Sequence, residues 1–111
     1  MAVADTEITE KKRAAYKEMY GKLYVTDYMG SRYVWRRLTQ DEFTTIAEDT
    51  DHIEDDDELV STREKEFFKL CALYPGKEQV EKDIEDDMIT TRIAREILFR
   101  SGFFPPRTVE L

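Results

Sequence analysis

The first apolar pattern along the chain has helical spacing. Residues 6–20 predict a helix that Thr6 can cap and Gly21 can end. Its apolar positions fall roughly on one face and are Ile8, Ala15, Tyr16, Met19 and Tyr20. Because this stripe is thin, two alternatives stay open: the helix packs on its own domain, or it lies on a partner.

The pattern then changes to one that is typical of strands. Residues 23–28 (LYVTDY) and 32–38 (RYVWRRL) are rich in aromatic and β-branched side chains, and the turn residues 29–31 (MGS) lie between them. Together they predict a β-hairpin. Each face of its second strand mixes apolar and cationic groups. A two-stranded ribbon is only marginally stable in water, so helices or a partner must cover these faces.

A helix start follows the hairpin directly. Thr39 and Glu42 have the spacing of a capping box, in which each side chain satisfies a backbone N–H at the start of a helix. Leu38 and Phe43 occupy the positions of a hydrophobic staple around the same cap. The two devices agree, and they predict a short helix that begins after Thr39.

The second half of the chain predicts further helices. Apolar spacing indicates a helix over 58–74, which Pro75-Gly76 breaks, and a last helix over 86–100, which Gly102 stops. Residues 77–87 are polar and fit either a loop or another turn of helix. The predicted fold class is therefore α+β and mostly helical: an N-terminal helix, one β-hairpin, then three or four helices around a single small core.

Length and composition indicate one domain with an acidic surface. The chain has 111 residues, so we expect a single domain: an N-terminal helix (1–21) that a partner can hold, a core (22–104) and a tail (105–111). The net charge of −8 disfavours nucleic acid and anionic membranes as partners. One cysteine, no apolar run of membrane-spanning length and no apolar leader region favour the cytoplasm.

The most acidic stretch is residues 48–58 (EDTDHIEDDDE). It fits a solvated loop followed by the charged first turn of the next helix. A calcium loop counted from Asp49 fails, because Glu54 replaces the required glycine and Val60 replaces the last glutamate. A contact with a basic surface remains a second interpretation of this stretch.

Candidate catalytic groups are scarce. His52 is the only histidine, and Cys71 lies on an apolar helical face with no base nearby in the pattern. The serines, at positions 31, 61 and 101, do not occupy a nucleophile elbow, and the chain has no glycine-rich phosphate loop. We therefore expect a protein that is not an enzyme, with no metal, no cofactor and no small-molecule substrate.

The remaining candidate sites are surfaces for partner proteins. Aromatic and arginine side chains dominate protein interfaces, and the chain gathers them on the second strand and after the last helix. The predicted partner-binding residues are Tyr33, Trp35, Arg36, Arg37, Phe103 and Phe104. A single tryptophan in a small domain is also a common core residue, so Trp35 fits either role.

Three segments carry a resemblance to a known group of proteins. They are YVWRRLTQDEF (33–43), LCALYP (70–75) and IAREILFRSGFF (93–104). In this order they resemble small tail-assembly chaperones and baseplate-associated proteins of tailed bacteriophages. The chain departs from that pattern in its acidic run and in residues 77–87, where a glycine-containing turn is more usual.

The resemblance implies a non-enzymatic protein that binds other phage tail or baseplate proteins. It would act as an assembly chaperone in the host cytoplasm or as a small component of the virion tail. The acidic composition supports an alternative, an inhibitor that mimics DNA and occupies the basic groove of a host nucleic-acid-binding enzyme.

Overall fold

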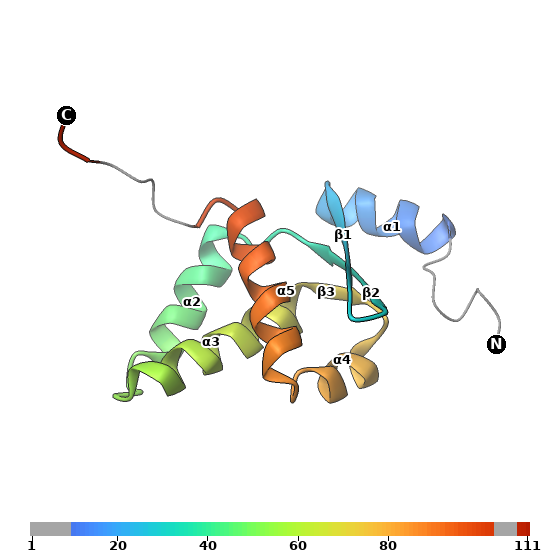
Figure 1. Ribbon diagram of the computed structural model, residues 1–111. Coiled ribbons are helices and arrows are strands. Elements are labelled where there is room, and N and C mark those ends of the chain that lie inside the picture. The colour runs from blue at the N-terminus through green and yellow to red at the C-terminus, as the bar shows by residue number, and fades with distance from the viewer. Residues whose placement is uncertain (1–9, 104–108) are drawn as a thin grey trace.

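The computed structural model describes residues 10–103 and 109–111 (Figure 1). Within these ranges the chain forms five helices and three strands, so the predicted α+β, mostly helical class is confirmed. In chain order they are α1 (Glu10–Tyr20), β1 (Leu23–Tyr28), β2 (Ser31–Arg36), α2 (Gln40–Thr50), α3 (Asp56–Cys71), β3 (Ala72–Tyr74), α4 (Lys77–Asp83) and α5 (Asp87–Arg100). None of the helices in the described ranges combines the length and the apolar character needed to cross a bilayer.

The predicted hairpin is confirmed, with a tighter turn than the sequence suggested. β1 and β2 pair in antiparallel fashion from Leu23 opposite Arg36 to Tyr28 opposite Ser31. Met29 and Gly30 alone form the turn, with φ angles of 55° and 80°. Two positive φ angles match the twist of the flanking strands, which is why two-residue hairpin loops use this backbone form.

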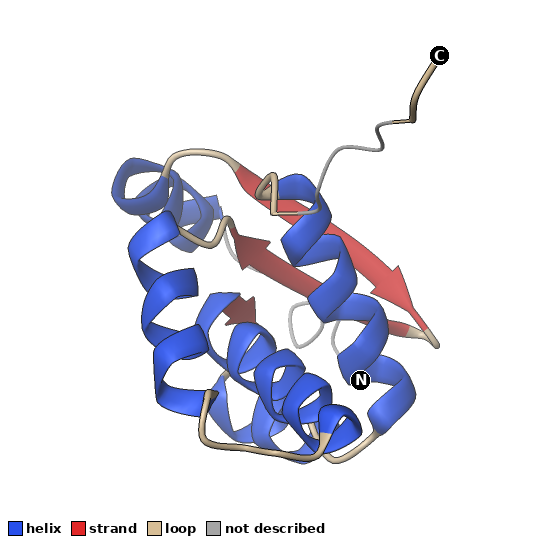
Figure 2. Cartoon of the chain, turned by 90° about the vertical axis from the view of Figure 1, so that its left-hand side faces the viewer, coloured by secondary structure: helices blue, strands red, loops and turns tan. Residues whose placement is uncertain are grey.

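The predicted helix over 58–74 is wrong at its C-terminal end. α3 stops at Cys71, and Ala72–Tyr74 form β3, which pairs with β2 and makes β2 the central strand (Figure 2). Tyr74 precedes Pro75, and the proline ring disfavours a helical conformation in the residue before it. β3 also satisfies backbone groups on the open edge of β2, which helical periodicity could not reveal.

The helical boundaries largely follow their predicted signals. α2 begins at the predicted capping box, the acidic run becomes the end of α2, a short turn and the first turn of α3, and α5 begins at Asp87 with Asp86 as its N-cap. Residues 77–83, left open between loop and helix, form α4. Gly102 follows α5 with a φ of 83°, a conformation that glycine adopts without strain.

One hydrophobic core lies between the sheet and the helices. α5 crosses one face of the sheet and packs against α3 (Figure 2). The fully buried side chains at its centre are Tyr33, Trp35, Phe68, Cys71, Ile93 and Ile97. Four consecutive residues of β2, 33–36, are buried, because a central strand is covered on both faces and at both edges.

The N-terminal helix, for which packing on the domain and contact with a partner were both left open, packs little on its own domain. α1 has no buried side chain; Tyr16 is half-buried, and Ala15, Met19 and Tyr20 are exposed. Ile8 lies outside the described residues. The stripe is too thin to hold the helix flat on the core, and α1 instead lies beside β1 at the edge of the domain (Figure 1).

Candidate protein-binding groove

The joint between β2 and α2 is built around a buried ion pair. The guanidinium of Arg36 donates from both terminal nitrogens to the two carboxylate oxygens of Glu42, each at 2.8 Å. It also donates to the backbone carbonyls of Arg37 at 3.0 Å and Leu70 at 3.3 Å. Arg36 is only 8% exposed, so these bonds satisfy a charge that would otherwise be costly to bury.

Glu42 also closes the capping box. Its carboxylate accepts the backbone N–H of Thr39 at 3.0 Å, and the hydroxyl of Thr39 accepts the N–H of Glu42 at 3.2 Å. The hydrogen bonds from Arg36 are the largest cause that lowers the pKa of Glu42, to about 2. The carboxylate of Glu42 therefore binds Arg36 of β2 and also caps the N-terminus of α2.

Tyr33 and Trp35 are structural residues rather than exposed anchors. Tyr33 is fully buried, its hydroxyl donates to Asp83 at 2.8 Å, and burial followed by this carboxylate raises its pKa to about 12. Trp35 is 1% exposed, stacks on Tyr24 with ring centroids 4.6 Å apart, and donates to Thr26 at 2.9 Å. For Trp35 the structure therefore supports the core alternative.

Several of the predicted partner-binding residues are buried, so the accessible part of the predicted surface is smaller than expected. Tyr33 and Trp35 are at most 1% exposed in the central strand, so a partner cannot reach their side chains without opening the fold. Arg36 is 8% exposed, and its charge is already matched by Glu42. Arg37 is exposed directly after that strand, and Phe103 is half-buried after α5. Phe104 lies outside the described residues. Of the predicted set, the structure thus leaves Arg37 and Phe103 accessible.

Arg36, Arg37 and Phe103 come together in one concavity, which we call the Arg37 groove. Its volume is about 500 Å³, and it lies between the end of α1, the β2–α2 joint and the end of α5. Its lining residues are Met19, Tyr20, Arg36, Arg37, Leu38, Thr39, Gln40, Ser101, Gly102 and Phe103. Met19 and Tyr20 were predicted only as part of the apolar stripe of the N-terminal helix and were not among the predicted partner-binding residues.

The walls of the Arg37 groove are held by specific contacts. The ring of Phe103 stacks on Phe43 with centroids 4.5 Å apart, and Phe43 stacks in turn on Phe67 at 5.8 Å. The Arg36 guanidinium lies 5.0 Å from the ring centre of Tyr20, in a cation–π arrangement. The groove is therefore preformed, which lowers the entropic cost of binding.

The charge of the Arg37 groove contrasts with that of the whole chain. The protein has 25 acidic residues and a net charge of −8, yet none of the described side chains that line this groove is acidic. Arg37 supplies an exposed positive charge, whereas the charge of Arg36 is matched by Glu42. The combination suits an apolar segment that carries a carboxylate.

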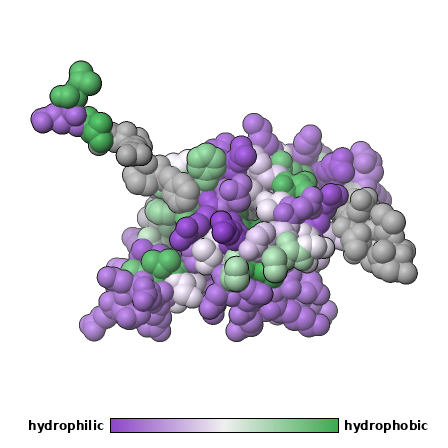
Figure 3. Space-filling model, viewed as in Figure 1, coloured by the Kyte–Doolittle hydropathy of each residue, from purple (hydrophilic) through white to green (hydrophobic). Residues whose placement is uncertain are grey.

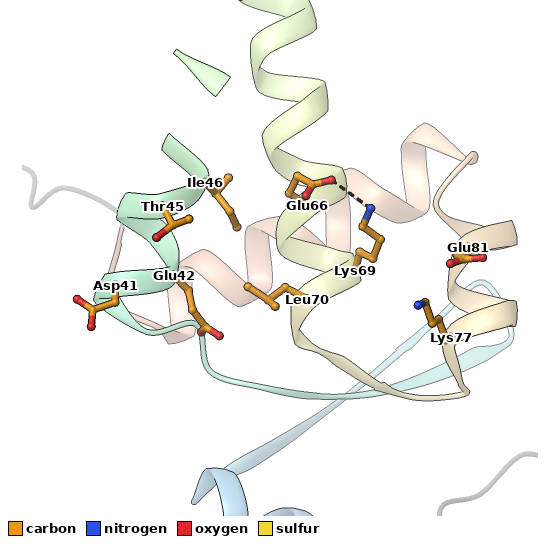
Figure 4. Close-up of a pocket in the computed structure, with 9 residues that line it drawn as sticks. All are labelled: Asp41, Glu42, Thr45, Ile46, Glu66, Lys69, Leu70, Lys77 and Glu81. Carbon is orange, nitrogen blue, oxygen red and sulfur yellow. Dashed lines mark ion pairs between the residues drawn. The ribbon is translucent and has the colours of Figure 1, made fainter. Parts of the chain in front are cut away.

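A second concavity lies beyond the Arg36–Glu42 pair, between α2, α3 and the start of α4 (Figure 4). It measures about 660 Å³, and Ile46 and Leu70 form its apolar part. Its charged side chains are mixed in sign, and the ammonium of Lys69 already pairs with Glu66 at 3.3 Å. The lining has four carboxylates against two lysines, but Glu42 and Glu66 are already paired with Arg36 and Lys69. The remaining charges favour no particular class of partner.

Cys71 and Ser101, two of the side chains considered as catalytic groups, have structural roles in the fold. Cys71 is fully buried, and burial raises the pKa of its thiol to about 12. Ser101 accepts the backbone N–H of Leu38 at 2.9 Å and so ties the end of α5 to the β2–α2 joint. Among the described residues, the histidine, cysteine and carboxylate side chains form no group of three that could hold a metal ion.

Comparison with known proteins adds no relative to these observations. No protein-family model, no curated protein and no solved structure matches the chain.

Proposed function

We propose that this chain is a non-enzymatic protein of a tailed bacteriophage that binds another tail or baseplate protein through the Arg37 groove. The proposal includes two forms, an assembly chaperone and a small virion component. The observation that carries it is the groove itself: an apolar and cationic concavity without acidic lining in a strongly acidic protein. The resemblance of residues 33–43, 70–75 and 93–104 to phage tail proteins supports the class of partner.

The groove also suggests the chemistry of the bound segment. Methionine, tyrosine and arginine are enriched at protein interfaces, and here Met19, Tyr20 and Arg37 line the groove together with Phe103. We expect a segment with an apolar side chain against Met19 and Phe103 and a carboxylate within reach of Arg37. Because the stacked rings are already in place, binding needs little rearrangement of the domain.

An affinity capture from phage-infected cells tests this proposal. The tagged wild-type chain should retain tail or baseplate proteins, and Arg37→Glu should lose them, because it puts a negative charge opposite the partner's carboxylate. Lys82→Glu is the matched control, with the same charge change at an exposed site on α4. Equal capture by Arg37→Glu would exclude the groove as the site, and the absence of any tail or baseplate protein would exclude the function.

Mass spectrometry of purified virions distinguishes the two forms. A virion component should be present in the particles, whereas a chaperone should be found only in the infected cell. Deletion of the gene should abolish or deform tails in both cases. Intact tails without the protein would contradict the chaperone and the component alike.

One observation supports the DNA-mimic alternative. The two acid-rich stretches, 48–58 and 78–87, lie on the same side of the molecule (Figures 1 and 3). Asp57 and Asp87 even line one groove. A mimic should retain a host nucleic-acid-binding enzyme at low salt and release it when DNA or salt is added. Retention that neither DNA nor salt reverses would count against this alternative.

A further inference from the structure

The N-terminal helix differs in charge from the rest of the protein. Between residues 10 and 22 there are five cationic side chains, Lys11, Lys12, Arg13, Lys17 and Lys22, against two acidic ones, Glu10 and Glu18. This segment therefore carries +3, and the remainder of a chain of net charge −8 carries −11. Most of this basic segment is α1, a helix of 11 residues.

α1 is attached to its own domain through few side chains. Tyr16 and Tyr20 contact each other with ring centroids 6.3 Å apart, and Tyr20 lies over Arg36. The other described side chains of α1 are exposed, including Met19 at 68% and the lysines at positions 11 and 17. One face of the helix thus holds the domain, while a basic face with a methionine at its edge is left uncovered.

A surface of opposite charge lies at the first turns of α3 and α5. There the chain places four consecutive acids at 55–58 and three at 85–87, all of them exposed. Between them is a groove of about 300 Å³, which we call the acidic groove. Its lining residues are Asp57, Val60, Ser61, Glu64, Asp87, Thr90, Thr91 and Arg95.

The acidic groove offers apolar contacts as well as charge. Val60, in its lining, is 54% exposed, and Met88, next to Asp87, is 62% exposed. The one cation in the lining, Arg95, lies 3.9 Å from Glu64, which also accepts a hydrogen bond from Thr91 at 3.0 Å. The carboxylates of the two acidic turns therefore outnumber the cations around the groove, which suits a basic helix with an apolar side chain.

We propose that the protein associates with itself, with α1 of one copy bound in the acidic groove of the next. Charge complementarity identifies the occupant, because residues 10–22, which contain α1, carry +3 and the acidic groove is flanked by seven acidic residues. α1 lies on the opposite side of the molecule from the first turns of α3 and α5 (Figure 1), whose residues line the acidic groove, so the contact is head-to-tail. A head-to-tail contact builds rings or filaments rather than a closed pair. This inference does not depend on the Arg37 groove.

Sedimentation of the full-length chain at increasing protein concentration tests the association. At about 0.1 M salt the average mass should rise above that of one chain, and at about 1 M salt it should return to one chain, because the screening length falls from about 10 Å to about 3 Å. A chain that stays monomeric at low salt over the whole concentration range would overturn the proposal.

A charge swap tests the two surfaces. Lys11→Glu/Lys17→Glu in α1 and Asp57→Lys/Asp87→Lys in the acidic groove should each weaken self-association about tenfold or more, since like charges then face each other. Mixing the two variants should restore assembly, because every contact in an alternating chain then joins opposite charges. Recovery on mixing also shows that both variants are folded.

A matched control separates the surfaces from total charge. Lys77→Glu/Lys82→Glu changes the net charge as much as the α1 variant does, but at exposed positions on α4. It should assemble like the wild type. If this control dissociates as much as the α1 variant, or if the mixture of the two swapped variants stays monomeric, the proposed contact is wrong.

Discussion

At the scale of single residues, the arginine next to Trp35 shows how tertiary structure changes the role of a side chain. Aromatic and arginine residues together are typical of interfaces, yet Arg36 binds Glu42 and so connects β2 to α2 inside the fold. Glu42 neutralises it and caps α2 at the same time. A residue type alone therefore could not decide between surface and interior.

Glu42→Ala should lower the free energy of unfolding by about 3 kcal/mol, because it leaves a buried arginine without its counter-ion and opens the capping box. Urea denaturation followed by circular dichroism measures the loss. Asp41→Ala is the control: it removes an exposed carboxylate from the same helical turn and should cost less than about 1 kcal/mol. Equal losses in the two variants would show that the ion pair contributes little.

Glu42 should also make the stability depend on pH. Its folded pKa of about 2 lies below the ordinary value of 4.5, so its contribution is complete above pH 4.5 and is lost as the pH falls toward 2. Urea midpoints should fall in this window for the wild type and fall less for Glu42→Gln. Asp41→Asn should keep the wild-type slope; an unchanged slope in Glu42→Gln would refute the assignment.

Cys71 should resist thiol reagents while the protein is folded. Its side chain is fully buried and its pKa is raised to about 12, so little thiolate exists at pH 8 and the reagent has no access to it. A chromogenic disulfide should react at once in urea and only slowly, at the rate of unfolding, in buffer. Rapid reaction of the native protein would mean that this part of the core opens readily.

At the scale of secondary-structure elements, local signals determine α2, the hairpin and α5, whereas long-range pairing determines β3. Local signals sufficed to predict α2, the hairpin and α5, because a capping box, a turn between two strand-like stretches and a short apolar stripe each involve residues close together in the chain. β3 follows helix-favouring residues and forms only because the edge of β2 is available to it. The strand that it pairs with lies 40 residues earlier in the chain, as the pairing of Val34 with Tyr74 shows.

The hairpin turn offers a stabilising substitution. Met29 has a φ of 55°, a backbone form that asparagine tolerates much better than methionine, and Asn-Gly is the preferred pair for such turns. Met29→Asn should raise the free energy of unfolding by about 0.5 kcal/mol. Met29→Ala, which shares no such preference, should give no gain. A loss of stability in Met29→Asn would show that the exposed methionine makes contacts of its own.

At the scale of the whole molecule, the protein consists of one packed domain and a helix on its edge. α1 contributes no buried side chain, and its tyrosine over Arg36 is worth about 1 kcal/mol or less at an exposed site. Charge is distributed on the same scale, with the basic α1 on one side and the acidic turns on the other (Figure 1). α1 therefore adds little to the stability but supplies the basic side of the molecule.

Removal of residues 1–20 should leave a cooperatively folded domain whose free energy of unfolding falls by about 1 kcal/mol. Urea denaturation and near-ultraviolet circular dichroism compare the shortened chain with the full one. The buried Trp35 and Tyr33 should keep their native signal. A loss as large as that of Glu42→Ala, or a vanished aromatic signal, would mean that α1 is part of the core.

The candidate site was predictable only in part. Arg37 and Phe103 were singled out from residue type, and the structure places both in the Arg37 groove. Tyr33, Trp35 and Arg36 were singled out for the same reason but are buried, because β2 has a neighbour on each side. Met19 and Tyr20 of α1 line this groove together with residues 36–40 and 101–103. These segments are distant in the sequence, so no local pattern could predict that they meet.

The sequence by itself determined the fold class, the hairpin, the start of α2 and the excess of negative charge, because these depend on composition or on residues close together in the chain. Only the tertiary structure decided that β2 is central, that Arg36 is buried against Glu42, and that the Arg37 groove exists. Burial and grooves are properties of segments brought together from distant positions. Burial is stabilised because apolar surfaces of distant segments are removed from water together. A single stretch of sequence does not specify which segments meet.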